Sequence, residues 1–243
     1  MKLLGLIGRP LSHSFSKNYF SEKFEQENIL HYQYHLYPLE TIDELRGLLK
    51  NNPELVGLNV TIPYKQEVIP FLDELTDVVA EANACNCIKI IDGKLIGYNT
   101  DVIGIEKTLS SFLKPLHTDA LILGTGGASN AVQYVFKKAG INFQVVSRTP
   151  SEKEIAYSHI TKMDMGKNKL IINCTPVGMY PLVDNAPDID YDAIGPDHIL
   201  FDLIYNPPKT LFLQRGEERG AVIINGMNLL KIQADESWRI WND

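Results

Sequence analysis

Four polar stretches interrupt the apolar runs in the N-terminal part of the chain and carry the side chains best suited to chemistry. They span residues 8–16, 59–65, 83–87 and 99–101. Together they contain a lysine (Lys65), an aspartate (Asp101) and several short hydroxyl and amide side chains. This set suits a small polyhydroxylated acid, because hydroxyls can bind its carboxylate while amides and the Lys/Asp pair bind its alcohols. Taken singly, Ser14, Ser16 and Asp101 also suit helix N-caps, and Asn59 suits a turn.

A glycine-rich turn further along the chain predicts a dinucleotide site. The turn consists of Gly124, Thr125, Gly126, Gly127 and Ala128. It follows an apolar strand predicted over residues 120–123 and precedes a helix that runs to residue 140. Glycines let the backbone approach a pyrophosphate, and the N–H groups at the helix N-terminus favour its negative charge. The fit to G-x-G-x-x-G is imperfect because Ser129 takes the third glycine position, and such a turn can also serve only to join a strand to a helix.

The end of the next strand selects the cofactor. An NAD enzyme places an acidic residue there, about 20 residues after the glycine turn, to bind the ribose 2′-hydroxyl. This chain has Ser147, Arg148 and Thr149 at that point, and its first acid is Glu152. The Arg148 guanidinium can pair with a 2′-phosphate, and the two hydroxyls add donors. NADP is therefore the predicted cofactor, the alternative being that Arg148 is a solvated surface arginine.

Composition and charge argue against several classes of partner. The 243 residues include 23 Lys and Arg against 30 Asp and Glu, a net charge of −7, so no basic field draws nucleic acid or an anionic membrane. No apolar run approaches the ~18 residues of a membrane span, and the N-terminal one is too short for a signal sequence. Three cysteines without C-x-x-C spacing predict no metal site and a reducing cytoplasm. Cys85 and Cys87 are expected on one face of a strand, as small buried residues.

Short apolar runs alternate with helical patterns throughout, which predicts an α/β fold. Strands are expected over residues 3–7, 32–37, 55–60, 85–91, 94–98, 120–123, 143–146, 170–173, 199–203 and 222–224. Helices are expected over residues 16–28, 41–50, 72–80, 102–113 and 228–241, and from the glycine turn to residue 140. The expected architecture is an N-terminal mixed α/β substrate domain (residues 1–102, completed by a C-terminal helix at 226–243) plus a Rossmann-like doubly wound parallel-sheet cofactor domain (103–225). Residues 149–169 are too few for helix, strand and helix, so a loop is expected to replace a helix there.

Short motifs follow one another along nearly the whole chain and resemble, in number and order, those of the shikimate dehydrogenase family. In the N-terminal part they are G-x-P-x-x-H-S-x-S (residues 8–16), N-V-T-x-P-x-K (59–65), A-x-N (84–86) and N-T-D-x-x-G (99–104). Further on they are G-x-G-G-A (124–128), S-R-T (147–149), N-x-T-x-x-G-M (173–179), D-x-x-Y-x-P (202–207) and Q-A (233–234). Each motif alone is weak evidence, but their order along the chain is specific to the family.

The resemblance implies a site for 3-dehydroshikimate and shikimate. Ser14 and Ser16 would hold the substrate carboxylate. The residues implied around the substrate hydroxyls are Asn59, Thr61, Lys65, Asn86, Asp101 and Gln233, with Tyr205 close by. For the cofactor, the resemblance adds Asp77, Thr175, Leu203 and Gly226 to the glycine turn and the 147–149 segment. The chain departs from the family pattern at Asn83, where Gly is common, and at Leu229, where Met is frequent.

The implied reaction is the reversible NADPH-dependent reduction of 3-dehydroshikimate to shikimate, in the chorismate pathway of aromatic amino acid biosynthesis. Lys65 would donate a proton to the developing alkoxide, and Asp101 would hold the lysine and a neighbouring hydroxyl in register. His13 is expected to be structural. The partner is a small anionic substrate, and the chain is expected to be a monomer or a homodimer. Two alternatives remain open: a quinate/shikimate dehydrogenase that uses NAD, and a catalytically silent NADP-binding sensor.

Overall fold

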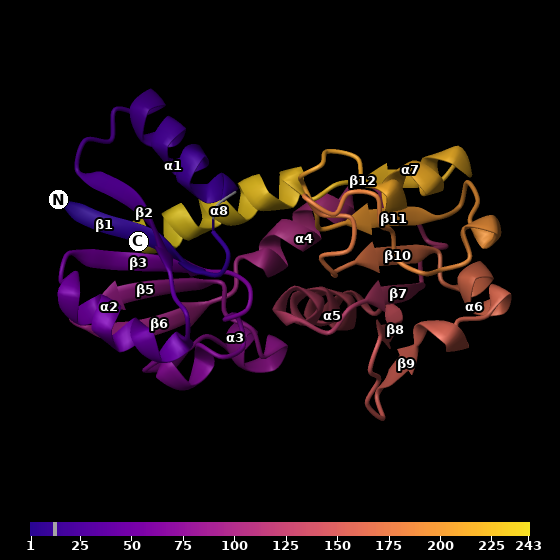
Figure 1. The fold of residues 1–243 in the computed structure, drawn as a ribbon, viewed down its shortest axis with the longest axis horizontal. Coiled ribbons are helices and arrows are strands. Elements are labelled where there is room, and N and C mark those ends of the chain that lie inside the picture. The colour runs from indigo at the N-terminus through magenta and orange to yellow at the C-terminus, as the bar shows by residue number, and fades with distance from the viewer. Residues whose placement is uncertain (12–13) are drawn as a thin grey trace. The chain divides into compact units, whose positions relative to one another are not determined.

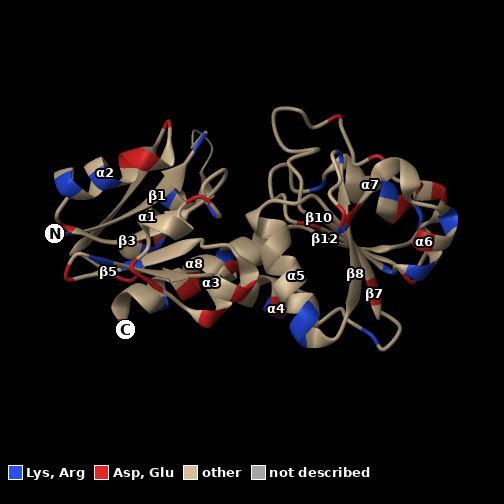
Figure 2. Ribbon diagram, turned by 90° about the horizontal axis from the view of Figure 1, so that it is seen from below, with Lys and Arg blue, Asp and Glu red and all other residues tan. Residues whose placement is uncertain are grey.

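The structure, a computed structural model, describes residues 1–11 and 14–243. His13, interpreted above as structural, lies outside the described residues. The chain forms two compact units (Figure 1). The first contains Met1–Thr100 and Ala234–Asp243, and the second contains Asp101–Gln233. The predicted domain boundaries lay at 102/103 and 225/226, so the observed units place the beginning of the last helix with the second unit. In Figure 2, acidic and basic segments are interspersed along the helices and loops.

The first unit is built on a mixed sheet with strand order β2-β1-β3-β5-β6-β4. Its elements are β1 (Lys2–Gly8), α1 (Phe15–Gln26), β2 (Tyr32–Pro38), α2 (Leu45–Asn51), β3 (Leu55–Val60), β4 (Glu74–Leu75), α3 (Asp77–Ala82), β5 (Cys87–Ile91) and β6 (Lys94–Tyr98). Strand β1 is parallel to β2 and β3, whereas β5 is antiparallel to both β3 and β6. The carboxyl ends of β1, β3 and β6 therefore meet the amino end of β5 at one edge of the sheet.

Apolar cores cover both faces of this sheet. One contains Ile7, Leu58 and Ile88, and the other contains Leu4 and Phe20. The end of α8 (Met227–Asn242) completes the second core. Its Trp241 donates from Nε1 to the carbonyl of Ile88 at 2.9 Å and packs over Gly57, where a Cβ would lie 2.3 Å from that nitrogen. Glycine at this position in β3 therefore makes room for the C-terminal helix.

The burial predicted for the two cysteines is confirmed, but their predicted common face is wrong. Cys85 and Cys87 are fully buried and free of disulfides. They do not share a face, however, because Cys85 packs in one core and Cys87 in the other. The cause is that β5 begins only at Cys87, so strand alternation does not extend back to Cys85.

The second unit has a fully parallel sheet with strand order β12-β11-β10-β7-β8-β9. Its elements are α4 (Asp101–Ser110), β7 (Asp119–Leu123), α5 (Gly127–Ala139), β8 (Asn142–Ser147), β9 (Glu154–Ala156), α6 (Lys162–Lys167), β10 (Leu170–Asn173), β11 (Ile199–Asp202), α7 (Leu211–Glu218) and β12 (Val222–Ile224). Every residue of β10 and β11 is buried, which accounts for their continuous apolar sequences. The predicted α/β class, with a mixed sheet followed by a Rossmann-like parallel sheet, is confirmed.

Two local predictions had different outcomes. The helix predicted over residues 72–80 is confirmed only from Asp77 on, as α3; its first part is wrong, because β4 lies there and the Asp73 carboxylate accepts from Leu95 N–H at 2.8 Å, which ties the segment to β6. The loop expected within 149–169 is confirmed, since β8 connects to β9 without a helix between them. Helix α7 was not predicted.

Of the helices in the described ranges, none has the length and apolar character needed to cross a membrane.

Candidate functional site

The polar stretches of the first unit lie at the sheet edge where β1, β3, β5 and β6 meet. Thr61 directly follows β3, Asn86 directly precedes β5, and residues 99–100 directly follow β6. A main-chain hydrogen bond joins two of these segments, because Val60 N–H donates to the Asn86 carbonyl at 2.8 Å. The strand order therefore brings together three stretches that are far apart in the sequence.

Ser14 and Ser16 follow β1 at the start of α1. Ser14 occupies the N-cap position, but its hydroxyl makes no capping hydrogen bond. That hydroxyl is buried and has no hydrogen-bond partner among the described residues. A helix-capping role therefore does not account for the Ser14 hydroxyl, whereas the carboxylate of a ligand would satisfy a buried donor of this kind. Ser16 is also buried and forms a hydrogen bond with Tyr34.

A buried polar network fixes the amides at this edge. Asn59 accepts from the Tyr34 hydroxyl at 2.9 Å and donates to the Ser237 hydroxyl at 2.9 Å. Ser237 lies 3.3 Å from the Thr100 hydroxyl, oxygen to oxygen. The Asn86 Oδ1 accepts from Thr100 N–H at 2.6 Å, and its Nδ2 donates to the Thr100 hydroxyl at 3.0 Å. Burial raises the pKa of Tyr34 well above its ordinary value, so the phenol stays a donor. The network thus sets the orientation of the Asn86 amide.

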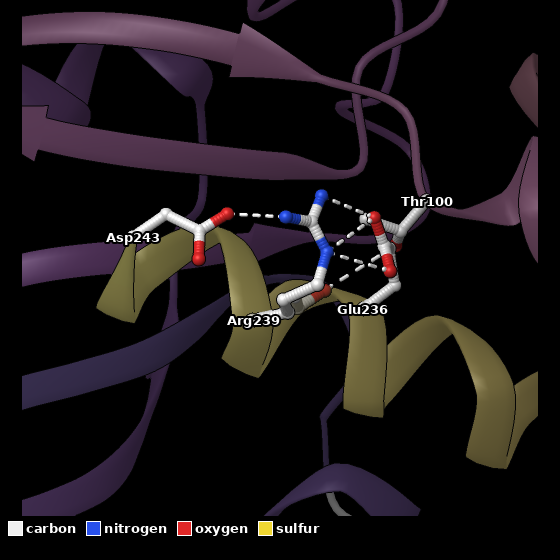
Figure 3. A network of polar contacts seen from close by, with 5 residues as sticks. Thr100, Glu236, Arg239 and Asp243 are labelled. Carbon is white, nitrogen blue, oxygen red and sulfur yellow. Dashed lines mark hydrogen bonds and ion pairs between the residues drawn. The ribbon is translucent and has the colours of Figure 1, made fainter.

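Sequence reasoning missed Ser237, Thr100 and Tyr34 as members of this network. Ser237 stands between Ala234 and Trp241 at helical spacing, so the available signal was a single hydroxyl on an apolar helix stripe. Figure 3 shows the neighbouring exposed side of this turn of α8, where Arg239 pairs with Glu236 at 2.7 Å and with Asp243. These exposed ion pairs contribute little to stability. The buried hydroxyls, by contrast, cannot form hydrogen bonds with water instead of with each other.

Lys65 and Asp101 are the charged residues expected to carry the chemistry. Lys65 is half-buried, and its carbonyl accepts from Cys85 N–H at 2.7 Å, which ties the lysine's backbone to the segment before β5. Asp101 is buried and is the first residue of α4, directly after Thr100. Lys65 belongs to the first unit and Asp101 begins the second. Each side chain is of a type that can hold or exchange a proton.

The glycine turn of the second unit lies between β7 and α5 and meets the geometric needs of a dinucleotide. Gly124 has φ +106°, and a Cβ there would lie 3.0 Å from the Thr175 Cγ2, so the turn itself requires glycine. Gly126 differs, because its φ of −78° suits any residue and a Cβ would meet no atom within 4 Å. Gly126 therefore leaves open space in front of the α5 N-terminus. No side chain caps that terminus and no acid stands in its first turn, so it suits a pyrophosphate.

The next strand, β8, ends in the residues expected to select the cofactor. Ser147 is buried, and its hydroxyl accepts from Thr149 N–H at 3.2 Å, which closes a tight turn around Arg148. The Arg148 side chain is exposed. A turn that presents an arginine without a neighbouring acid fits a 2′-phosphate better than a free ribose hydroxyl.

Other expected cofactor residues follow β10, β11 and β12 at the same carboxyl edge of the parallel sheet. Thr175 donates from its hydroxyl to the Asn173 Oδ1 at 2.6 Å. Gly226 packs so closely on Leu203 that a Cβ would lie 2.1 Å from its carbonyl oxygen. Asp202, whose side chain had no predicted role, is fully buried at the end of β11 between these segments. Its sequence signals were its place at the end of an apolar strand and at the start of the D-x-x-Y-x-P motif, and neither assigned its side chain a role.

Three further expected site residues lie outside the segments described above. Tyr205 is half-buried in the loop after β11, and Gln233 is buried in α8, where it donates from Nε2 to the Leu230 carbonyl at 2.9 Å. Asp77 is an exposed residue of the first unit, at the first position of α3. Asn83 has φ +48° at the end of α3, a left-handed conformation that explains why Gly and Asn both suit this position. Leu229 packs beside Gly104 of α4.

The parallel sheet, its central glycine turn and the arginine after the next strand define the second unit as a Rossmann-like dinucleotide-binding fold. Comparison with known proteins narrows the class. Residues 6–88 match the family model of the shikimate dehydrogenase substrate binding domain. The chain is 34% identical over 257 residues to the shikimate dehydrogenase (NADP(+)) of Methanococcus aeolicus, with 99% of this chain and 91% of that protein covered.

Solved structures give the same result. The shikimate dehydrogenase of Aquifex aeolicus superimposes with a TM-score of 0.88 at 32% identity, covering 100% of this chain and 92% of the other. The Thermus thermophilus enzyme, solved in complex with NADP(H) and shikimate, superimposes with a TM-score of 0.87 at 27% identity, covering 99% of this chain and 93% of the other. The chain belongs to the shikimate dehydrogenase family.

Proposed function

We propose that this protein catalyses the reversible NADPH-dependent reduction of 3-dehydroshikimate to shikimate, a step in chorismate and aromatic amino acid biosynthesis. The observation that carries the proposal is the sheet edge of the first unit. There the serine, threonine, lysine and asparagine residues implied by the family motifs follow or precede adjoining strands, within the stretch that matches the substrate-binding family model. The family relatives named above support the same activity.

The substrate side of the proposal divides the work among hydroxyls, amides and charged groups. Ser14 and Ser16 donate to the substrate carboxylate, and the buried Ser14 hydroxyl, which has no partner among residues 1–11 and 14–243, supports this role. Thr61 and Asn86 bind substrate hydroxyls, with the Asn86 amide held by Thr100. Gln233 and Tyr205 are proposed as further contacts. The Asn59 amide is fully occupied, because its oxygen accepts from Tyr34 and its nitrogen donates to Ser237 and to the Asn86 carbonyl. Asn59 therefore helps to position Asn86, in addition to any substrate contact of its own.

Lys65 and Asp101 are proposed to manage the proton. In the reducing direction, the Lys65 ammonium donates a proton to the carbonyl oxygen as it becomes an alcohol, and in the oxidising direction the neutral amine accepts it. Asp101 binds the neighbouring hydroxyl and holds the lysine in register with it. Such acid–base assistance typically accelerates a reaction by ~10²–10⁴-fold.

The second unit is proposed to hold NADP, which supplies or accepts the hydride. Residues 124–128 cradle its pyrophosphate at the α5 N-terminus, and residues 147–149 hold its 2′-phosphate. Thr175, Leu203 and Gly226 line the remaining part of the carboxyl edge, and Asp77 is proposed as a contact from the first unit. The open space in front of Gly126 and the absence of an acid at the end of β8 support this assignment.

Substrate and cofactor domains are proposed to correspond to the two units.

The three cysteines are free thiols and two are fully buried, which supports a cytoplasmic location. We expect a monomer or a homodimer, with a small anionic substrate and no nucleic-acid or membrane partner.

A spectrophotometric assay tests the proposal and separates it from its nearest rivals. The purified protein is offered shikimate or quinate with NADP⁺ or NAD⁺, and reduced cofactor is followed by absorbance. We expect the highest kcat/KM for shikimate with NADP⁺. Preferential turnover of quinate with NAD⁺ would favour the quinate/shikimate alternative. NADP⁺ binding without turnover of either acid would favour a silent sensor.

A further inference from the structure

The Asp202 carboxylate is a buried acid without a cationic partner. It is the last residue of β11 and has no solvent-exposed surface. Within the described part of the chain, no Lys, Arg or His forms an ion pair with it. Its Oδ1 accepts from Asn173 Nδ2 at 3.1 Å and from Ile204 N–H at 3.0 Å, and its Oδ2 accepts from the Thr210 hydroxyl at 2.5 Å. Burial raises the pKa of this carboxyl to about 6, and the three hydrogen bonds oppose the shift.

The donors to Asp202 come from the end of β10 and from both ends of the loop after β11. Asn173 ends β10, and its own Oδ1 accepts both the N–H of Thr175, at 3.1 Å, and the hydroxyl of Thr175, at 2.6 Å. The Thr175 hydroxyl in turn accepts from Val177 N–H at 3.2 Å. A single chain of hydrogen bonds therefore runs from Asp202 into the loop after β10.

The same carboxylate fixes the loop after β11. Ile204 N–H donates to Asp202, and the Ile204 carbonyl accepts from Gly226 N–H at 3.0 Å. Leu203 lies between these two bonds, with its carbonyl directly over Gly226. Thr210 also accepts from Leu213 N–H at 3.4 Å as the N-cap of α7, so the far end of this loop is anchored to Asp202 as well.

Stability alone does not account for an acid in this place. A buried carboxylate loses its hydration, and replacement of a buried charge by an apolar residue of similar size is often neutral or stabilising. What the carboxylate provides is geometry, because its two oxygens accept at once from the end of β10 and from both ends of the loop after β11. An apolar side chain could fill the same volume but could not fix the directions of those segments.

We propose that Asp202 is a positioning residue for the NADP cofactor: it holds the loops after β10 and β11 in the conformation in which Thr175, Leu203 and Gly226 can line the cofactor site. Asp202 itself does not touch the cofactor in this arrangement. The inference rests on the proposed function, because it takes these loops to be cofactor contacts.

The test compares three variants with the wild-type protein by titration of NADPH fluorescence. Asp202→Ala removes the acceptor, Asp202→Asn keeps one carbonyl oxygen for Asn173 and Ile204, and Glu217→Gln is the matched acid-to-amide control on the exposed side of α7. We expect Asp202→Ala to raise the Kd for NADPH at least tenfold, Asp202→Asn to stay within threefold, and the control to match the wild type. The KM for shikimate at saturating NADP⁺ should change less than twofold in all three.

Hydrogen exchange provides a second measurement. In Asp202→Ala, exchange should accelerate in residues 174–177 and 203–205 and stay unchanged in β3 of the first unit. If this variant does not fold, Asp202→Ser, which keeps one hydroxyl oxygen, takes its place with the same expectations. A folded Asp202→Ala protein with an NADPH Kd within twofold of wild type overturns the inference, as does an equal weakening of NADPH and shikimate. A wild-type protein that binds no NADPH overturns the proposed function itself.

Discussion

The substitution Gly126→Ala separates a cofactor requirement from a folding requirement. Gly126 has an extended backbone, with φ −78° and ψ 179°, and a methyl group at its Cα would meet no protein atom within 4 Å. The folded state therefore accepts alanine without strain. Alanine lowers the entropy of the unfolded chain, which stabilises by about 0.4–1 kcal/mol. As an N-cap, alanine is less favourable than glycine by an amount of similar size, roughly 0.5–1 kcal/mol.

These opposing effects leave the free energy of unfolding within about 1 kcal/mol of wild type, a shift in Tm of only about 2–4 °C for a chain of this size. The cofactor responds differently, because the methyl group occupies the space through which a pyrophosphate reaches the N–H groups of α5. Loss of one hydrogen bond to a charged group costs about 1.5–3 kcal/mol. The Kd for NADPH should therefore rise by about 10- to 150-fold.

The assay pairs NADPH titration with thermal unfolding on the same samples, with two controls. Gly195→Ala also places a methyl group in open space but lies in the loop before β11, so it should change neither quantity. Gly124→Ala replaces a glycine at φ +106° and should lower Tm clearly. A Gly126→Ala protein that binds NADPH within twofold of wild type would refute the assignment of residues 124–128 to the pyrophosphate.

Three further predictions rest on the same geometry. Arg148→Ala should weaken NADPH far more than NADH in parallel titrations, because only NADPH carries the 2′-phosphate; an equal loss for both would contradict this role. Lys65→Ala should lower kcat by ~10²–10⁴-fold in steady-state assays with a much smaller change in KM, whereas near-normal kcat would exclude it as the proton donor. Burial raises the pKa of Asp202 from 3.8, the ordinary value expected in the unfolded chain, to about 6 in the folded protein. Between these two values the folded protein binds a proton that the unfolded chain does not, so the contribution of Asp202 to the free energy of unfolding falls as pH rises from ~4 to ~6. Urea unfolding should show the free-energy difference between wild type and Asp202→Asn moving by about 2 kcal/mol in favour of the variant between pH ~4 and pH ~7, and a pH-independent difference would refute the shifted pKa.

Local sequence signals predicted most of the fold because they act over a few residues. The buried parallel strands were predictable because their sequences are continuous apolar runs. The strands predicted over 85–91 and 94–98 are joined at Asp92-Gly93, whose φ of +50° and +79° suit a tight turn between antiparallel strands. The failures arose where tertiary contacts decide. Asp73 turns its segment toward β6, which the helical pattern of residues 72–80 could not indicate. Cys85 and Cys87 lie on different faces because the strand starts later than the apolar run.

Prediction of the candidate site also succeeded where the signal is local and failed where tertiary contacts decide. Motif spacing identified the residues that carry reactive groups, such as Lys65 and Arg148, because these types are chemically distinctive. It could not identify the residues that position the neighbouring amides and loops. Ser237 becomes part of the site only when α8 returns to β3, and Asp202 only when β10 and β11 lie side by side. Such partners are separated in the sequence by 178 and 29 residues, so their pairing is a product of the fold.

Product stoichiometry tests the central claim most directly. The wild-type protein is incubated with shikimate and NADP⁺, and NADPH and 3-dehydroshikimate are quantified separately by absorbance and by chromatography. The account predicts one 3-dehydroshikimate for each NADPH formed, and reversal of the reaction when NADPH and 3-dehydroshikimate are supplied. NADPH formation without 3-dehydroshikimate, or no turnover by a protein that binds both ligands, would contradict it.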